Sequence, residues 1–354
     1  MVPISRKRVV IVGAGPIGME LAVAFRRHTI PFEIFDAGQI GQTISWWAPQ
    51  TRWFSSNDRI AIAGVPLVTP DQSKATREQY LAYLRGIATQ FEIRVHTYQP
   101  VLAIHRRDAG FTVATKTASG LGETECRAIV LAVGGMDRAR RLGVEGEDLP
   151  HVDGYLREPH RYHGRRVLII GGRNSAVEAA LRLHHAGAEV GLSYRGEQLP
   201  KEHIKYWLYP EVQSLIRAGR ITAYPGTRPS RITPTHVVLE RLESGADDPL
   251  THVPADDVLC LIGYEQDKSL FLQAGVELID ETQRPAFDVQ TMETNVPGIY
   301  VAGTAVAGTQ SSRYTTFLEN CHEHVDKIVA HLTGRSTRSA DAAFRCQIEA
   351  APES

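Results

Sequence analysis

One stretch of the chain occurs twice. RVVIVGAGPIGMELAVAF at residues 8–25 returns as RVLIIGGRNSAVEAALRL at residues 166–183. Each copy reads as a β-branched strand, a glycine-rich turn and an amphipathic helix, and a further strand follows each, FEIFDAG or EVGLSYRG. This order is that of a βαβ unit. The repeat therefore predicts an α/β fold with two Rossmann-like dinucleotide-binding domains.

The first turn has three glycines at the spacing of a phosphate-binding turn. Gly13 allows the tight turn, Gly15 lets the backbone approach a pyrophosphate, and Gly18 lets the helix pack on the strand. The N-terminus of the helix then offers free N–H groups to the anion. The second turn has Arg173 at the second glycine position and Ala176 at the third, where alanine is an accepted replacement. We interpret Arg173 as an additional phosphate contact.

The residue that follows each second strand distinguishes the two nucleotides. Asp36 lies 23 residues after Gly13. A carboxylate there accepts hydrogen bonds from ribose hydroxyls and repels a 2′-phosphate, which suits FAD or NAD. Arg195 lies 24 residues after Gly171, where a cation pairs with the 2′-phosphate of NADPH. The order of an FAD turn followed by an NADPH turn is that of a two-dinucleotide flavoprotein.

Composition limits the other classes of function. The chain has 354 residues and a net charge of -1, which gives no basic surface for nucleic acid. No apolar run reaches the ~20 residues of a membrane-spanning helix. The segment before the first strand, MVPISRK, is too short for a signal peptide. We therefore expect a cytoplasmic protein that binds neither nucleic acid nor membrane.

The segments between and after the repeats suggest a domain order. Residues 74–91 predict an amphipathic helix, and the alternating residues 93–135 predict an antiparallel β-meander. Residues 145–164 are rich in Gly, Pro and charge, which is typical of a linker. Residues 313–334 predict a helix that completes the first domain. The expected domains are an FAD-binding domain of residues 1–155 and 280–334, an NADPH-binding domain of residues 160–275, and a tail of residues 335–354.

The order of these motifs resembles the low-molecular-weight thioredoxin reductase superfamily. The motifs are GAGPIG, VGG, GGRNSA, YRG, IGY and ETNVPGIYVAG, and they cover residues 7–334. TRWFSSNDRIAIAGVP and FLEN are similar to the bacillithiol-disulfide reductase group in particular. The resemblance implies a homodimer that uses FAD and NADPH and reduces a small-molecule or small redox-protein acceptor.

The resemblance also implies the residues that bind the cofactors. Thr304 stands where many members of the superfamily have Asp, and its hydroxyl can still hydrogen-bond a ribityl hydroxyl. The sequence predicts no metal site. The residues implied for FAD are Gly13, Gly15, Pro16, Ile17, Gly18, Asp36, Gln42, Thr43, Phe54, Ser55, Gly134, Gly303, Thr304 and Phe317. The residues implied for NADPH are Gly172, Arg173, Asn174, Ser175, Arg195 and Gly263.

The cysteines depart from the family pattern. The four cysteines, Cys126, Cys260, Cys321 and Cys346, form no C-x-x-C pair, whereas thioredoxin reductases carry one in the NADPH domain. Bacillithiol-disulfide reductases carry a cysteine inside the first glycine turn, where this chain has Ile17. Thiol–disulfide exchange requires a thiolate. The sequence therefore predicts chemistry on the flavin itself, with no catalytic side chain and no cysteine relay.

Three alternatives to this reductase remain open. One is a ferredoxin- or flavodoxin-type NADP reductase, although the mixed charge indicates no basic docking patch. Another is a flavin monooxygenase-like enzyme, which needs a dry pocket at the flavin. Such a pocket and simple core packing explain equally well the aromatic residues Trp46, Trp47, Trp53 and Phe54. The last is a non-enzymatic flavin redox sensor. CHEH at residues 321–324 reads as helix surface or core rather than as a metal site.

Overall fold

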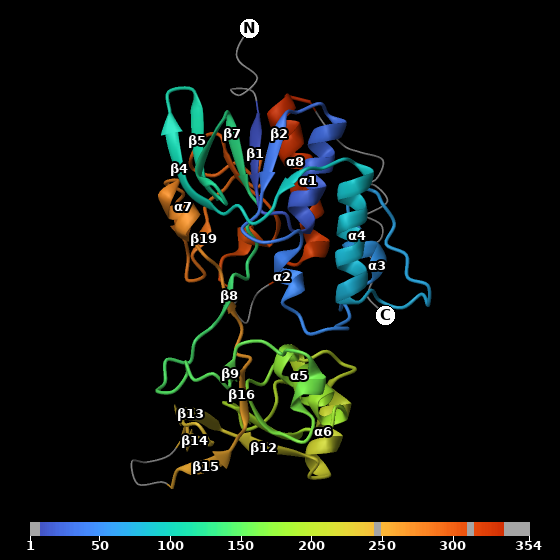
Figure 1. The fold of residues 1–354 in the computed structure, drawn as a ribbon, viewed down its shortest axis with the longest axis vertical. Helices are drawn as coiled ribbons and strands as arrows, with labels where there is room; N and C mark the ends of the chain where they lie inside the picture. The colour runs from blue at the N-terminus through green and yellow to red at the C-terminus, as the bar shows by residue number, and fades with distance from the viewer. Residues whose placement is uncertain (1–7, 244–248, 310–314, 336–354) are drawn as a thin grey trace. The chain divides into compact units, whose positions relative to one another are not determined.

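The computed structural model describes residues 8–243, 249–309 and 315–335. The chain forms two compact units (Figure 1). Unit 1 comprises Met1–Trp46, Gln50–Asp137 and Glu265–Ser354, and unit 2 comprises Trp47–Pro49 and Arg138–Tyr264. The expected tail and Cys346 lie outside the described residues.

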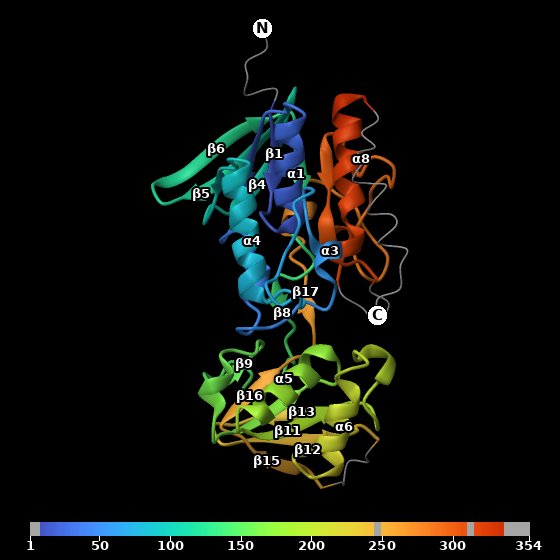
Figure 2. The same cartoon turned by 90° about the vertical axis from the view of Figure 1, so that its right-hand side faces the viewer.

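Unit 1 is built on a parallel sheet with the order β20-β7-β1-β2-β3. The central strand β1 consists of VVIV and is buried along its whole length, as expected for a strand covered on both faces. Helix α1 lies between helices α4 and α8 (Figures 1 and 2). The elements named here are β1 (Val9–Val12), β2 (Phe32–Phe35), β3 (Val95–His96), β7 (Ala128–Leu131), β20 (Ile299–Val301), α1 (Pro16–Arg27), α4 (Arg77–Gln90) and α8 (His322–Thr333).

An antiparallel meander joins β3 to β7, inside the stretch 93–135 that predicted one, whereas β3 and β7 themselves belong to the parallel sheet. Its three strands pair in the order β4-β5-β6. They are β4 (Val101–Arg107), β5 (Gly110–Thr117) and β6 (Gly120–Cys126). The smaller elements of unit 1 are α2 (Gln42–Ser45), α3 (Asn57–Ile60), α7 (Ser269–Gln273), β18 (Leu278–Ile279), β19 (Arg284–Pro285), η4 (Gly303–Ala307) and η5 (Leu318–Asn320).

Unit 2 repeats the architecture with the strand order β12-β11-β10-β16-β9. Alternate residues of β10 enter different cores, because successive side chains of a strand point to opposite faces. Val167 and Ile169 pack with helix α5, whereas Leu168 and Ile170 pack with the meander β13-β14-β15. The elements are β9 (Val152–Asp153), β10 (Arg166–Ile170), β11 (Glu189–Tyr194), β12 (Ile221–Pro225), β13 (Thr227–Ile232), β14 (His236–Arg241), β15 (Thr251–Pro254), β16 (Asp257–Cys260), η2 (Pro159–Tyr162), η3 (Lys201–His203), α5 (Asn174–His185) and α6 (Tyr209–Arg217).

The boundary between the units differs from the expected one. The chain crosses between Asp137 and Arg138 and returns between Tyr264 and Glu265, where β8 (Arg138–Ala139) pairs with β17 (Tyr264–Glu265). Residues 145–164, expected to be a linker, belong to unit 2 because β9 pairs with β16 and Tyr162 is buried in the core. Turn-rich composition does not show where backbone hydrogen bonds are made.

The last helix also starts later than expected. The residues 313–334 predicted one helix, but α8 begins at His322. Asn320 accounts for the break, because its amide accepts a hydrogen bond from Phe317 N and donates one to Thr315 O. Such side-chain bonds to the backbone compete with helical ones. None of the described helices combines the length and the apolar composition that a membrane span requires.

Candidate dinucleotide sites

The first glycine turn requires glycine at two positions for reasons internal to the protein. Gly13 has φ +106°, and a Cβ there would lie 2.3 Å from the carbonyl oxygen of Ala132. A Cβ at Gly18 would lie 1.9 Å from the carbonyl oxygen of Gly13. Both contacts are with backbone atoms, which can move aside only at a high cost in free energy. These glycines therefore allow α1 to pack closely against β1 and β7.

Gly15 is different, because the protein leaves open space beside it. A Cβ there would meet no atom within 4 Å, and its φ of −71° suits any residue. Helix α1 follows directly with Pro16 at its start, and its first turn has no acidic side chain. The free N–H groups of this turn favour an anion. The turn thus fits the pyrophosphate of a dinucleotide, with the open side at Gly15.

Asp36 fastens the glycine turn to the end of β2. Its Oδ2 accepts a hydrogen bond from Ala14 N over 2.7 Å, and its Oδ1 accepts one from Gly38 N over 2.8 Å. Burial raises the pKa of Asp36, and these two backbone bonds oppose that rise. A carboxylate has about four lone-pair sites, so acceptor capacity remains for ribose hydroxyls. The sequence indicated the ribose contact but not this structural one.

Several residues predicted for the flavin meet at the carboxyl ends of β7 and β20. Thr304 Oγ1 accepts a hydrogen bond from Gly135 N over 3.1 Å. Gly134 has φ +79°, and Thr304 Oγ1 is the nearest atom, 3.9 Å away, that a Cβ there would meet. Thr43 Oγ1 lies 3.5 Å from Met136 O. Ligands of open α/β sheets bind at the carboxyl ends of the strands.

Two further predicted residues have local structural partners. Gln42 Oε1 accepts a hydrogen bond from Gln39 N over 3.2 Å. Ile17 is buried with 5% of its surface exposed, and a Cβ at Gly303 would lie 3.3 Å from Ile17 Cβ. Ile17 therefore packs α1 against the loop after β20 with an apolar side chain.

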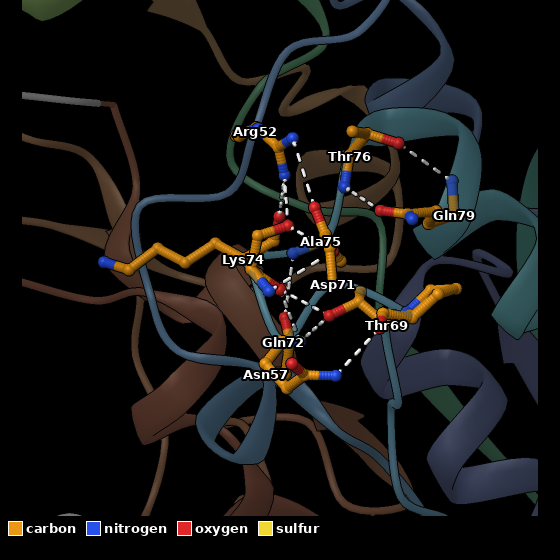
Figure 3. Close-up of polar contacts among 11 residues, drawn as sticks. Arg52, Asn57, Thr69, Asp71, Gln72, Lys74, Ala75, Thr76 and Gln79 are labelled. Carbon is orange, nitrogen blue, oxygen red and sulfur yellow. Dashed lines mark hydrogen bonds and ion pairs between the residues drawn. The ribbon is translucent and has the colours of Figure 1, made fainter.

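The segment around Phe54 and Ser55 is braced from two sides. Ser55 Oγ donates a hydrogen bond to Glu319 Oε1 over 2.9 Å, and Lys74 donates one to the carbonyl of Phe54. Asn57 holds the loop that follows, as Figure 3 shows, through bonds to Thr69 Oγ1 and from Ala75 N. Phe317, the other aromatic residue predicted near the flavin, is 48% exposed, and its N–H donates a hydrogen bond to Asn320 Oδ1.

In unit 2, close backbone contacts likewise restrict the second glycine turn to glycine. Gly171 has φ +142°, and a Cβ there would lie 2.4 Å from Leu261 O. Gly172 is close to β11, since a Cβ there would lie 3.0 Å from Tyr194 Cβ. Gly263 has φ +102°, and a Cβ there would lie 3.8 Å from Arg140 Cδ. The turn therefore packs on β11 and on the residue after β16, directly before the N-terminus of α5.

Of the polar residues predicted for this site, one makes a hydrogen bond within the protein and three are exposed to solvent. Asn174 Oδ1 accepts a hydrogen bond from Lys205 N over 2.8 Å, so it fastens the loop after β11. Ser175 is exposed, as are Arg173 and Arg195. Both guanidinium groups are thus open to solvent. Arg173 is the N-cap residue of α5 and Arg195 follows β11, and exposed guanidinium groups at these positions fit a phosphate ligand.

The cysteines of the described residues are buried and unpaired. Cys126, Cys260 and Cys321 are free thiols with 3% or less of their surface exposed. Burial raises the pKa of Cys126 and Cys260 to about 12, and it raises that of Cys321 further. A thiol of this kind forms almost no thiolate near neutral pH. Among the same residues, no cluster of three metal-ligating side chains occurs.

Comparison with known proteins identifies the family. The family model "Pyridine nucleotide-disulphide oxidoreductase" matches residues 10–303. The chain therefore belongs to this family, as the motif order predicted.

Individual relatives agree with the family. Bacilliredoxin reductase Bdr from Bacillus subtilis (strain 168) is 32% identical over 330 residues, covering 93% of this chain and 98% of that protein. The solved bacillithiol disulfide reductase Bdr from Bacillus cereus superposes with a TM-score of 0.86 at 31% identity, covering 93% and 99%. A ferredoxin–NADP reductase from Ignicoccus hospitalis is 25% identical over 305 residues, covering 83% and 88%. The fold of T. acidophilum thioredoxin reductase matches with a TM-score of 0.71 at 19% identity, covering 93% and 99%.

These findings confirm the class of protein and its cofactors. The chain has a thioredoxin reductase-like α/β fold and is a flavin-dependent NADPH oxidoreductase that uses FAD and NADPH. An enzyme of this family does not fit the alternative of a non-enzymatic sensor. The residue-by-residue assignment of the two sites stays a prediction.

Proposed function

We propose that this enzyme passes electrons from NADPH through FAD directly to a small-molecule or small redox-protein acceptor, without a cysteine relay. FAD, when bound, accepts the hydride of NADPH and supplies two electrons to the acceptor. For a disulfide acceptor, NADPH, one proton and the disulfide give NADP⁺ and two thiols. We also propose that the enzyme acts as a cytoplasmic homodimer.

The observation that carries this proposal is the state of the thiols. Cys126, Cys260 and Cys321 are buried, and each has a raised pKa. An attacking cysteine needs thiolate character and access to its partner. The position of the turn cysteine in the related reductases is Ile17, which is buried and has no sulfur.

The residues of unit 1 hold and orient FAD in this proposal. The open side of Gly15 and the N-terminus of α1 receive the pyrophosphate. The remaining lone pairs of Asp36 accept hydrogen bonds from ribose hydroxyls, and the Thr304 hydroxyl forms a hydrogen bond with the ribityl chain. In unit 2, Arg173 and Arg195 bind the phosphates of NADPH by charge-assisted hydrogen bonds.

The test compares NADPH oxidation by wild-type enzyme with that by a variant in which all four cysteines are alanine. Each is assayed with low-molecular-weight disulfides, quinones, ferredoxin and O₂. We expect both proteins to use the same acceptor at rates within about threefold. Treatment of the NADPH-reduced wild type with iodoacetamide serves as a second measurement, because it needs no substitution. Rapid labelling that abolishes turnover would contradict direct transfer.

A ferredoxin–NADP reductase is the second candidate function. Its support is the sequence similarity to the Ignicoccus hospitalis enzyme, which is lower than that to the bacilliredoxin reductase. The same acceptor panel separates the two. Ferredoxin reduction with no activity on any disulfide would favour the second candidate, and the reverse result would favour the first.

A further inference from the structure

Gln266 is a buried polar residue that the sequence motifs did not single out. It lies one residue after β17, where the chain has returned to unit 1. Only 6% of its surface is exposed. Long polar side chains are mostly found at the surface, so a buried glutamine calls for hydrogen-bond partners.

The amide nitrogen of Gln266 has two such partners. Nε2 donates to the carbonyl oxygen of Gly134 and to that of Ala305, each over 2.9 Å. Both carbonyls can only accept, so the NH₂ group must face them and the amide orientation is fixed. Gly134 follows β7 and Ala305 follows β20. Gln266 therefore bridges the two strand ends at which the predicted flavin residues gather.

The amide oxygen of Gln266 has no partner. Oε1 is buried, and within residues 8–243, 249–309 and 315–335 no donor reaches it. A buried acceptor without a donor is unfavourable, because it has lost its hydrogen bonds to water. In native proteins such an atom commonly meets a ligand or an ordered water. The site around Gln266 thus lacks one hydrogen-bond donor.

We infer that Gln266 Oε1 accepts a hydrogen bond from the ribityl or isoalloxazine part of bound FAD. This inference rests on the proposed FAD site, because Gly134 and Thr304 are among its predicted residues. In oxidised FAD the donors of this part are the ribityl hydroxyls and the ring N3–H, whereas N1, N5 and the two ring carbonyl oxygens only accept. Gln266 is then a cofactor-binding residue that also ties the returning chain to the flavin.

The test measures FAD binding to the apoenzyme by the change in flavin fluorescence. For Gln266→Leu we expect the Kd of FAD to rise about tenfold, the effect of losing roughly one hydrogen bond. Gln90→Leu is the matched control, since Gln90 is an exposed glutamine at the end of α4, and its Kd should stay at the wild-type value.

Flavin analogues separate a direct bond from a loosened site. N3-methyl FAD and ribityl-deoxy FAD each lack one donor. One analogue lacks the donor that bonds to Oε1, and wild type and Gln266→Leu should bind this analogue with equal Kd values. For the other analogues, the ratio of the Kd of Gln266→Leu to that of the wild type should stay about tenfold. A ratio that persists for every analogue, or equal Kd values for FAD itself, overturns the inference.

A crystal structure of the wild-type FAD complex decides the matter if the variant does not fold. A flavin donor within hydrogen-bond distance of Gln266 Oε1 supports the inference. A water at Oε1, with every flavin donor beyond 3.5 Å, contradicts it. If the wild-type protein binds no FAD, the proposed function fails first, so the two failures are distinguishable.

Discussion

The backbone N–H of Gly303 donates a hydrogen bond to Nδ1 of His324 over 3.2 Å, which joins the end of β20 to the third residue of α8. His324 is 7% exposed. Its ring must present an unprotonated Nδ1 to this N–H, and the proton of the neutral imidazole then lies on Nε2. The loop that carries Gly303 and Thr304 is therefore held by a neutral histidine.

This bond predicts a pH dependence of stability. Burial lowers the pKa of His324 to about 4, against about 6.5 in an unfolded chain. Between these values the unfolded state binds a proton that the folded state excludes, so the free energy of unfolding falls as the pH drops. The full effect is about 3 kcal/mol. Denaturant titrations of the apoenzyme from pH 8 to pH 4.5 measure most of it, because the loss is complete only below the folded-state pKa of about 4.

The variants of His324 separate titration from packing. His324→Asn keeps an acceptor near the Nδ1 position and cannot be protonated, so its unfolding free energy should depend less on pH than that of the wild type. His105→Gln, on the exposed face of β4, is the control and should keep the wild-type slope. Identical slopes in His324→Asn and wild type would show that other groups cause the dependence.

The two glycine positions of the first turn should respond differently to alanine. Gly18→Ala places a Cβ 1.9 Å from Gly13 O, so we expect a loss of about 1–3 kcal/mol in apoenzyme stability. Gly15→Ala meets no protein atom within 4 Å and should leave the apoenzyme stability unchanged. It should still raise the Kd of FAD about tenfold or more, because the pyrophosphate approaches there. Unchanged FAD binding in Gly15→Ala would argue against this turn as the pyrophosphate site.

Arg195 should determine the preference for NADPH over NADH. Removing a charge-assisted hydrogen bond to a phosphate weakens binding by about 1.5–3 kcal/mol, or roughly 10- to 100-fold. We expect Arg195→Ala to raise the KM of NADPH by that factor and to leave the KM of NADH within about twofold. Arg217→Ala, at the exposed end of α6, is the control. Equal losses with both nicotinamides would assign Arg195 a general structural role.

A buried polar pair joins α1 to α8. His322 Nδ1 lies 2.7 Å from Glu20 Oε2, and His322 Nε2 lies 2.9 Å from Arg59 O. Glu20 Oε1 also accepts from Ala63 N over 3.1 Å. Both side chains are 4% exposed. Removal of one partner leaves the other buried without the hydrogen bond that joined them, which costs about 3–5 kcal/mol.

We therefore expect Glu20→Leu and His322→Leu each to destabilise the apoenzyme by that amount. The double variant should be more stable than the sum of the two losses predicts, because it leaves neither partner behind. Chemical denaturation of the three variants and wild type completes the cycle. Additive losses would show that the pair is not coupled.

The sequence by itself determined the parts of this protein that depend on neighbouring residues. The repeated strand, glycine turn and helix predicted both Rossmann-like units, and the alternating pattern at 93–135 predicted the meander. The positive φ of Gly13 and Gly171 follows from the same turn chemistry. These features are local, because hydrophobic period and turn residues act over a few positions.

Only the tertiary structure decided which distant groups meet. Glu20 and His322 are 302 residues apart in the sequence, and Gln266 is 132 residues from Gly134. The strand β9 lies in a stretch whose composition resembles a linker, and its place in unit 2 depends on pairing with β16. The burial that raises the pKa of the three described thiols likewise depends on how the sheets and helices pack. Hydrogen-bond partners and solvent exclusion are properties of the folded chain, so no local pattern specified them.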